Sequence, residues 1–183
     1  AARNSDEVVI FAVQEDRSAI PFSDRFALMK QGVADLRNVV VISGGDYIVS
    51  NATFPTYFIK GTDELAAQTR LDAMIFAQRI APELNITARY VGEEPNDKTT
   101  MAYNQAMSEI LPENGIELYI IPRKEINGEV ISASKVRKAV LEGNWEAVAS
   151  MVPKSTLIYL QSEKGNEIVK RIELMETIKG GIR

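Results

Sequence analysis

Four short segments rich in strand-forming residues alternate with longer segments whose apolar residues recur with helical spacing. The short segments lie at 8–13, 39–42, 88–91 and 116–121, and the first two are unbroken apolar runs. Runs of this length are typical of strands that are buried on both faces of a parallel sheet. We therefore predict four strands, each followed by a polar or glycine-containing loop.

The segments between these strands have the periodicity of helices. Ser23 is a candidate N-cap for a helix that ends near Gly32, and a second helix is expected over 62–80. The predicted buried stripe of the second helix is Leu71, Met74 and Ile75. A third helix, which begins near residue 99, carries apolar residues at i, i+3, i+4, i+7 and i+8. Those residues are Tyr103, Ala106, Met107, Ile110 and Leu111.

This alternation predicts βαβ units and therefore an α/β fold with a doubly wound, Rossmann-like parallel sheet. We expect residues 1–160 to form one such domain and residues 161–183 to add a charged helix to it. Ligands of these sheets bind beyond the carboxyl ends of the strands. The loops at that edge would be 14–17, 43–46, 92–95 and 122–125. We expect them to converge with a further helix, which starts after Ile131, on one crevice.

That further helix is opened by the stretch Ile131–Arg137, which follows a polar turn. Either Ser132 or Ser134 can serve as its N-cap, and Gly143 suits its C-terminal end. Its apolar face is formed by Val136, Ala139 and Val140, which are spaced at i, i+3 and i+4.

The charge of this helix is unusual. A helix N-terminus normally recruits Asp or Glu, yet no acid occurs from Val130 to Leu141. The first two turns instead carry Lys135, Arg137 and Lys138. Free backbone N–H groups, two hydroxyls and basic side chains suit a bound anion, above all a polyphosphate. The alternative is an ordinary capped helix with a solvated basic face.

The composition of the 183-residue chain narrows the possible functions. A net charge of −4 and a pI of about 5.1 argue against a dedicated nucleic-acid binder or a protein of anionic membranes. Without Cys there is no disulfide framework or thiolate nucleophile, and without His there is no Ser-His-Asp triad or His-ligated zinc. The sequence has no apolar run of about 18 residues, the length of a membrane-spanning helix, and no signal peptide. We therefore expect a cytoplasmic protein.

Several stretches together resemble the citrate lyase ligase family, and their combination is more specific than any one of them. They are E-D at 15–16, P-F-S-D-R at 21–25, A-T-F-P-T-Y-F at 52–58, V-G-E-E-P at 91–95, Y-N-Q at 103–105, I-P-R at 121–123 and the stretch 131–137. The likeness runs from about residue 1 to about residue 160 and excludes the closing helix. Residues 131–137 also match I-S-x-S/T-x-x-R, the second signature of the nucleotidylyltransferase superfamily. The resemblance therefore implies a Rossmann-like domain of that superfamily, of the HUP type.

The resemblance implies an ATP-dependent ligase. Such an enzyme acetylates the thiol of the phosphopantetheine-type prosthetic group on the acyl carrier subunit of citrate lyase. Acetate would attack the α-phosphorus of ATP, and the carrier thiol would then take the acetyl group from acetyl-adenylate, with release of AMP and pyrophosphate. The protein's part is to hold the phosphates and stabilise charge on the departing pyrophosphate. Mg²⁺ is expected to arrive with ATP, and no dedicated metal site is predicted.

The same resemblance assigns candidate site residues. Ser132, Ser134 and Arg137 map onto the polyphosphate-binding signature, and Ser134 and Arg137 are the candidate catalytic residues. Gly92 and Glu93 map onto the loop near the adenosine.

Four further residues are candidates from their type and place. Arg123, at a strand's carboxyl end, either binds phosphate or carboxylate or balances Glu125. Thr53 and Tyr57 either line the acyl or pantetheine pocket or pack beside a proline. Asn104 is expected to face the site, because its neighbour on the helix lies on the apolar stripe.

One departure from the family concerns histidine. The superfamily's first signature, H-x-G-H, follows the first strand and stabilises the phosphates, whereas this chain has no His. Ala1-Ala2-Arg3 resembles the end of the next helix, and the family's preceding acetyltransferase-like domain has no counterpart. We therefore expect an N-terminally truncated domain that lacks its central first strand. Losing that strand would forfeit ~10 kcal/mol, comparable with a domain's whole stability of about 5–15 kcal/mol. Such a chain should therefore fold poorly unless it rearranges or a neighbour supplies the strand.

Two other functions remain open at this point. A pantetheine-phosphate or mononucleotide adenylyltransferase would share the fold and the second signature. A catalytically inactive nucleotide-binding fragment would account for the missing histidines.

Overall fold

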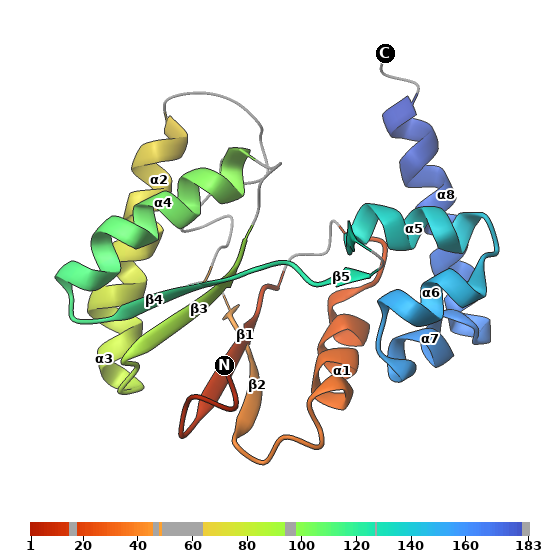
Figure 1. The fold of residues 1–183 in the computed structure, drawn as a ribbon. Coiled ribbons are helices and arrows are strands. Elements are labelled where there is room, and N and C mark those ends of the chain that lie inside the picture. Colours follow the sequence, from red (N-terminus) through yellow and green to blue (C-terminus); the bar gives the residue numbers. More distant parts are fainter. Residues whose placement is uncertain (15–17, 46–47, 49–63, 94–97, 127, 181–183) are drawn as a thin grey trace.

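A computed structural model describes residues 1–14, 18–45, 48, 64–93, 98–126 and 128–180 (Figure 1). All four predicted strands are present in it. They are β1 (Val8–Ala12), β2 (Val39–Ser43), β3 (Ala88–Gly92) and β4 (Glu117–Ile121). β1 pairs with β2 and β3 pairs with β4, both in parallel, so the predicted strand direction is confirmed. A short antiparallel hairpin, which the apolar pattern did not indicate, follows β4. Its strands are β5 (Glu125–Ile126) and β6 (Glu129–Val130).

The two parallel pairs are separate sheets among the described residues, which differs from the single doubly wound sheet that the sequence predicts. β1 and β3 each have one sheet edge without a strand partner in the described chain. Both pairs nevertheless pack on one hydrophobic cluster. Phe11 of β1, which pairs with β2, and Val91 of β3, which pairs with β4, contact the same set of buried residues. The structure thus establishes a mixed α/β fold with small parallel sheets.

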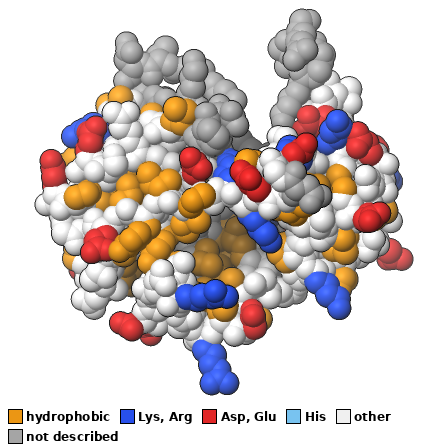
Figure 2. Space-filling view, viewed as in Figure 1, with side chains coloured by type: hydrophobic (Ala, Val, Ile, Leu, Met, Phe, Trp, Pro, Cys, Tyr) orange, Lys and Arg blue, Asp and Glu red, His pale blue; other side chains and the backbone are white. Residues whose placement is uncertain are grey.

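Apolar side chains of these strands remain exposed. Val40 on β2 and Ile120 on β4 are 51% and 52% exposed, and Tyr119 and Ile121 are also exposed. Strands of parallel sheets are normally covered on both faces. Figure 2 shows hydrophobic side chains gathered around a hollow in the middle of the molecule. The strand layer is therefore only partly covered in the described chain.

Helices surround the strands and form the C-terminal part of the chain (Figure 1). Before the hairpin they are α1 (Phe22–Gly32), α2 (Glu64–Ile75), the π-helical turn η3 (Phe76–Ile80), α3 (Ala81–Glu83) and α4 (Lys98–Glu113). After the hairpin they are α5 (Ala133–Leu141), α6 (Trp145–Met151), α7 (Lys154–Leu160) and α8 (Glu163–Gly180). No helix among the described residues has the length and apolar composition that crossing a membrane requires.

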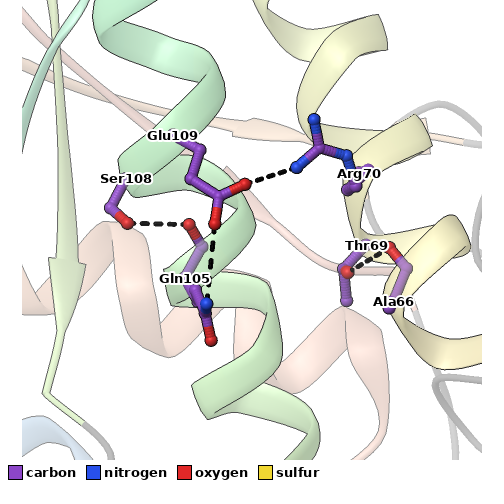
Figure 3. Close-up of polar contacts among 6 residues, drawn as sticks. All are labelled: Ala66, Thr69, Arg70, Gln105, Ser108 and Glu109. Carbon is purple, nitrogen blue, oxygen red and sulfur yellow. Dashed lines mark hydrogen bonds and ion pairs between the residues drawn. The ribbon is translucent and has the colours of Figure 1, made fainter. Parts of the chain in front are cut away.

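The first cluster lies between α2, α4 and the strands. Its buried residues are Ile48, Ala73, Phe76, Ala77, Ala81, Tyr103, Met107, Ile110, Leu111 and Ile116. All five residues that were predicted to be buried on α4 are buried. Figure 3 shows polar contacts between the exposed sides of α2 and α4. Arg70 of α2 pairs with Glu109 of α4, and the Gln105 amide donates to the same carboxylate at 3.5 Å.

Most polar groups at this cluster have hydrogen-bond partners, although Arg89 Nη1 is buried without one among the described residues. The Tyr103 hydroxyl donates to the Asp72 carboxylate and accepts from Arg89 Nη2 at 3.0 Å. Burial raises the pKa of Tyr103 well above its usual value. The buried Thr69 hydroxyl donates to the Ala66 carbonyl at 2.9 Å (Figure 3). These bonds allow α2 to present polar residues to the core without a large desolvation cost.

Two local predictions are wrong. Leu71 and Met74 are 51% and 42% exposed, and the buried positions of α2 and η3 include Asp72, Ala73 and Phe76. The helical period is as predicted, but the buried face is rotated because Asp72 is a hydrogen-bond partner in the core. Helix α1 begins at Phe22 after Pro21 and has no side-chain cap, so Ser23 does not cap it. The start of α2 at residues 62 and 63 lies outside the described residues.

The second cluster joins the segment before α1 to the C-terminal helices. Its buried residues are Ala19, Ala139, Val140, Val148, Leu160, Ile168 and Ile172. A polar tie reinforces it, because Asp24 of α1 accepts from the Tyr159 hydroxyl at 2.8 Å and from Lys164 Nζ at 2.6 Å. The bond from Lys164 holds the pKa of Asp24 below its usual value. Helix α8, which follows α7, is thereby fixed against α1 as well as α5.

Candidate functional site

Helix α5 begins as the sequence predicts. Ser132 is the N-cap, and its Oγ accepts a bond from the Lys135 backbone N–H at 3.2 Å. The first turn contains no acidic residue, and Gly143, with a φ of +65°, follows the C-terminal end. Of the two candidate caps, the structure thus selects Ser132 and leaves Ser134 exposed within the first turn.

Ser134 and Arg137 lie close together at the start of α5. Arg137 Nη2 donates to Ser134 Oγ at 3.1 Å, and Arg137 Nε donates to Glu176 Oε1 of α8 at 3.1 Å. The Arg137 side chain is 28% exposed, so the guanidinium is accessible but supported. We call Ser132, Ser134 and Arg137 the helix-entrance half-site.

Carboxylates from outside α5 reach its basic side chains. Lys135 Nζ pairs with Glu129 Oε2 at 2.8 Å, and this bond lowers the pKa of Glu129. Lys138 lies 3.8 Å from the Glu142 carboxylate. Residues 130–141 contain no acidic residue, yet the carboxylates of Glu129 and Glu142 lie beside the basic side chains of this segment. Exposed pairs of this kind contribute little to stability and exchange readily, so an anionic ligand would compete with weak contacts.

Four other predicted residues meet at the carboxyl ends of β3 and β4. The Glu93 backbone N–H donates to the Ile121 carbonyl at 2.9 Å, which extends the β3–β4 pairing by one residue. Arg123 Nε donates to the Glu93 carbonyl at 2.9 Å, and Asn104 Nδ2 of α4 donates to the Gly92 carbonyl at 3.2 Å. We call Gly92, Glu93, Asn104 and Arg123 the strand-edge half-site.

The hairpin β5–β6 connects the two half-sites. In its register Glu125 faces Val130, and the Ile131 N–H donates to the Lys124 carbonyl at 2.9 Å. Arg123 and Ser132 directly flank this last bond. The hairpin therefore brings Lys124, the neighbour of Arg123, within hydrogen-bond distance of Ile131, the neighbour of the N-cap Ser132.

A cavity of about 300 Å³ lies where the hairpin meets α5 and α6. Its apolar lining includes Ile126, Val130 and Met151, and the Lys135–Glu129 pair lines it as well. The cavity adjoins the helix-entrance half-site through Lys135.

The structure does not test the remaining predicted site residues. Thr53 and Tyr57 lie outside the described residues. Over the described ranges, no cluster of three or more Asp, Glu, His or Cys side chains has an arrangement that could hold a metal ion.

Two residues at the site were missed by sequence reasoning. Glu129 directly precedes the acid-free stretch, so its position gave a usable signal. Glu176 lies 39 residues from Arg137 in a helix that the family resemblance did not include, and no local pattern pointed to it.

The fold and this site define a class of protein. A mixed α/β fold with small parallel sheets, together with a capped helix whose first turn is basic, is consistent with a nucleotidylyltransferase-like domain.

The chain belongs to the citrate lyase ligase family, because the model of the citrate lyase ligase C-terminal domain matches residues 1–160. It is similar to proteins named citrate (pro-3S)-lyase ligase from three bacteria. The identity is 40% over 165 residues for Klebsiella pneumoniae (87% of this chain, 48% of that protein) and 41% over 169 residues for Haemophilus influenzae (88% and 50%). For Escherichia coli strain K12 it is 40% over 168 residues (88% and 48%). The chain thus spans about half the length of these relatives.

Proposed function

We propose that this chain carries the ATP-binding part of a ligase that acetylates the prosthetic-group thiol of the citrate lyase acyl carrier protein. The observation that carries the proposal is the entrance of α5, where the Ser132 cap, the Ser134 hydroxyl and the Arg137 guanidinium adjoin free helix N–H groups. Membership of the citrate lyase ligase family supplies the reaction class.

In this proposal the helix-entrance half-site takes the triphosphate of ATP. Helix N–H groups and a guanidinium are the donors that bind phosphate oxygens best. Ser134 and Arg137 would stabilise the negative charge that develops on pyrophosphate as it departs. Ser132 would keep the first turn in place as its cap. Mg²⁺ would be held mainly by the phosphates, which agrees with the usual mode of its binding to nucleotides.

The strand-edge half-site would take the adenosine. Gly92 ends β3 and Glu93 follows it, and Arg123 donates to the Glu93 carbonyl beside the hairpin that leads to Ser132. This adjacency supports binding of one ligand across both half-sites. Thr53 and Tyr57 are proposed to line the acyl or pantetheine pocket, and Asn104 to face the substrate from α4.

The reaction would proceed in two balanced steps. An acetate oxygen attacks the α-phosphorus, the bond from that phosphorus to the bridging oxygen breaks, and pyrophosphate leaves. The carrier thiol loses its proton to water, its sulfur attacks the acetyl carbonyl carbon, and AMP leaves with the electron pair of the broken C–O bond. The residues proposed here act in the first step, by binding and orienting ATP.

We also propose that the two strand pairs belong to one doubly wound sheet, in the order β2-β1-x-β3-β4, where x is one further strand. The parallel direction of both pairs and their shared cluster support this order. In a full-length family member, amides along the inner edges of β1 and β3 should then exchange with solvent as slowly as those inside the pairs. Fast exchange at both edges would contradict a single sheet.

The function is tested by measuring ATP binding and pyrophosphate release with different acceptors. We expect release that depends on acetate and the reduced carrier thiol. Release only with pantetheine phosphate or a mononucleotide would indicate an adenylyltransferase instead. ATP binding without turnover would indicate a catalytically inactive nucleotide-binding chain instead.

A further inference from the structure

The contacts of Arg137 use only part of its guanidinium. Nε donates to Glu176 Oε1 and Nη2 donates to Ser134 Oγ, both at 3.1 Å. Among the described residues Nη1 has no hydrogen-bond partner. A carboxylate that blocked phosphate binding to this guanidinium would accept bonds from two of its nitrogens, in the bidentate arrangement. Glu176 instead takes one nitrogen and leaves the Nη side of the group directed to the α5 entrance.

The position of Glu176 is set by the buried face of α8. Ile168 and Ile172 are 3% and 4% exposed and pack in the second cluster with Val140 of α5. Glu176 follows at the same four-residue spacing, so it lies one turn further along the face that contacts α5. The contact with Arg137 is therefore a consequence of helix packing.

A long arginine side chain loses conformational freedom when it binds a ligand, and this loss opposes binding. A carboxylate that holds Nε in advance reduces that loss and fixes the plane of the group. We propose that Glu176 is a positioning residue, which orients Arg137 toward the polyphosphate of ATP. This inference rests on the proposed function, and it assigns a role to α8, which lies beyond the 1–160 segment that the family model matches.

The test compares ATP affinity among variants of the purified protein, with the unfolding midpoint measured on each. Glu176→Gln keeps an acceptor oxygen at nearly constant shape but removes the charge, so the bond to Arg137 Nε becomes a weaker neutral one. ATP binding should then weaken about 3- to 10-fold, the range that separates charged from neutral hydrogen bonds. Glu173→Gln is the matched control, because Glu173 is an exposed carboxylate on the same helix, and its affinity should equal that of the parent.

A double-mutant cycle separates positioning from a general structural effect. In an Arg137→Ala background, Glu176→Gln should have no further effect on ATP affinity. Equal loss in both backgrounds would overturn the inference, and so would tighter binding by Glu176→Gln, which would show competition with phosphate. If Arg137→Ala weakens binding while Glu176→Gln does not, the inference fails and the proposed function stands. If Arg137→Ala itself has no effect, both fail.

Discussion

The two half-sites are held in place by different kinds of contact. In the strand-edge half-site, Asn104 and Arg123 donate to the backbone carbonyls of Gly92 and Glu93, which belong to the end of a strand. In the helix-entrance half-site, Arg137 and its neighbours on α5 are held by carboxylates, including Glu176 of α8. The contacts of the strand-edge half-site therefore hold the backbone that follows β3 in place. The contacts of the helix-entrance half-site orient the charged side chain of Arg137.

This difference indicates how each half would respond to change. The strand-edge half-site depends on the first cluster, so substitutions that matter there should act through folding. The helix-entrance half-site depends on exchangeable ion pairs and on where α8 lies, so substitutions there should act on ligand affinity with little change in stability. The following predictions test this distinction.

The largest effect is expected from removing support beneath the strand-edge half-site. Leu111 of α4 is fully buried in the first cluster, on the helix that carries Asn104. Leu111→Ala should lower the free energy of unfolding by about 2–5 kcal/mol, because it removes buried surface and leaves a cavity. Urea denaturation measures the change. Leu174→Ala on α8, where the side chain is 63% exposed, is the control and should change it by less than about 0.5 kcal/mol.

The next effect concerns ligand binding alone. Arg137→Ala should weaken ATP binding by about 1.5–3 kcal/mol, or about 10- to 150-fold, through loss of hydrogen bonds from a charged donor. Isothermal titration measures the affinity. Arg79→Ala, an exposed arginine of η3, is the control and should bind ATP like the parent. A large fall in the unfolding midpoint of Arg137→Ala would contradict the distinction between the two half-sites.

A third prediction concerns the close packing of the first turn of α8 against the end of α7. A Cβ at Gly165 would lie 2.2 Å from the Leu160 carbonyl oxygen, which is backbone and cannot move aside easily. Gly165→Ala should destabilise the protein by about 1–3 kcal/mol and also weaken ATP binding, because α8 carries Glu176. Gly32→Ala is the matched control, since open space surrounds that position. Thermal unfolding and ATP titration on both variants test this coupling, and a destabilised Gly165→Ala with unchanged affinity would contradict it.

The smallest effect is a pH dependence of stability. The Lys164 bond lowers the pKa of Asp24 in the folded state, so its contribution to stability is complete above the unfolded-state pKa. That contribution is lost as the pH falls through the lowered folded-state value. Asp24→Asn should therefore reduce stability at neutral pH and flatten its decline in acid. Unfolding midpoints from neutral to acidic pH measure this. If the midpoints of parent and variant changed in parallel with pH, the bond between Lys164 and Asp24 would not contribute to stability.

Much of this architecture follows from local sequence patterns. The strands, the buried face of α4 and the Ser132 cap depend on residues close in sequence, and the structure confirms them. The buried face of α2 was mispredicted because a periodicity of large aliphatic residues does not show that Asp72 will find Tyr103 in the core.

Features that depend on distant residues were not accessible from the sequence. The division of the strands into two pairs is a matter of long-range pairing, which apolar runs do not encode. The carboxylates near α5 show the same limit, since Glu176 reaches Arg137 only because α8 packs on α5. The candidate site was therefore predictable as a set of donors, but not with its charge partners.

The central claim is that the α5 entrance binds the triphosphate of ATP, and a crystal structure with a non-hydrolysable ATP analogue tests it most directly. We predict phosphate oxygens within hydrogen-bond distance of the first-turn N–H groups, Ser134 Oγ and the Arg137 guanidinium, with the adenosine beside Gly92. A structure of the bound analogue in which this entrance holds no phosphate, and Glu129 still covers Lys135, would contradict the account.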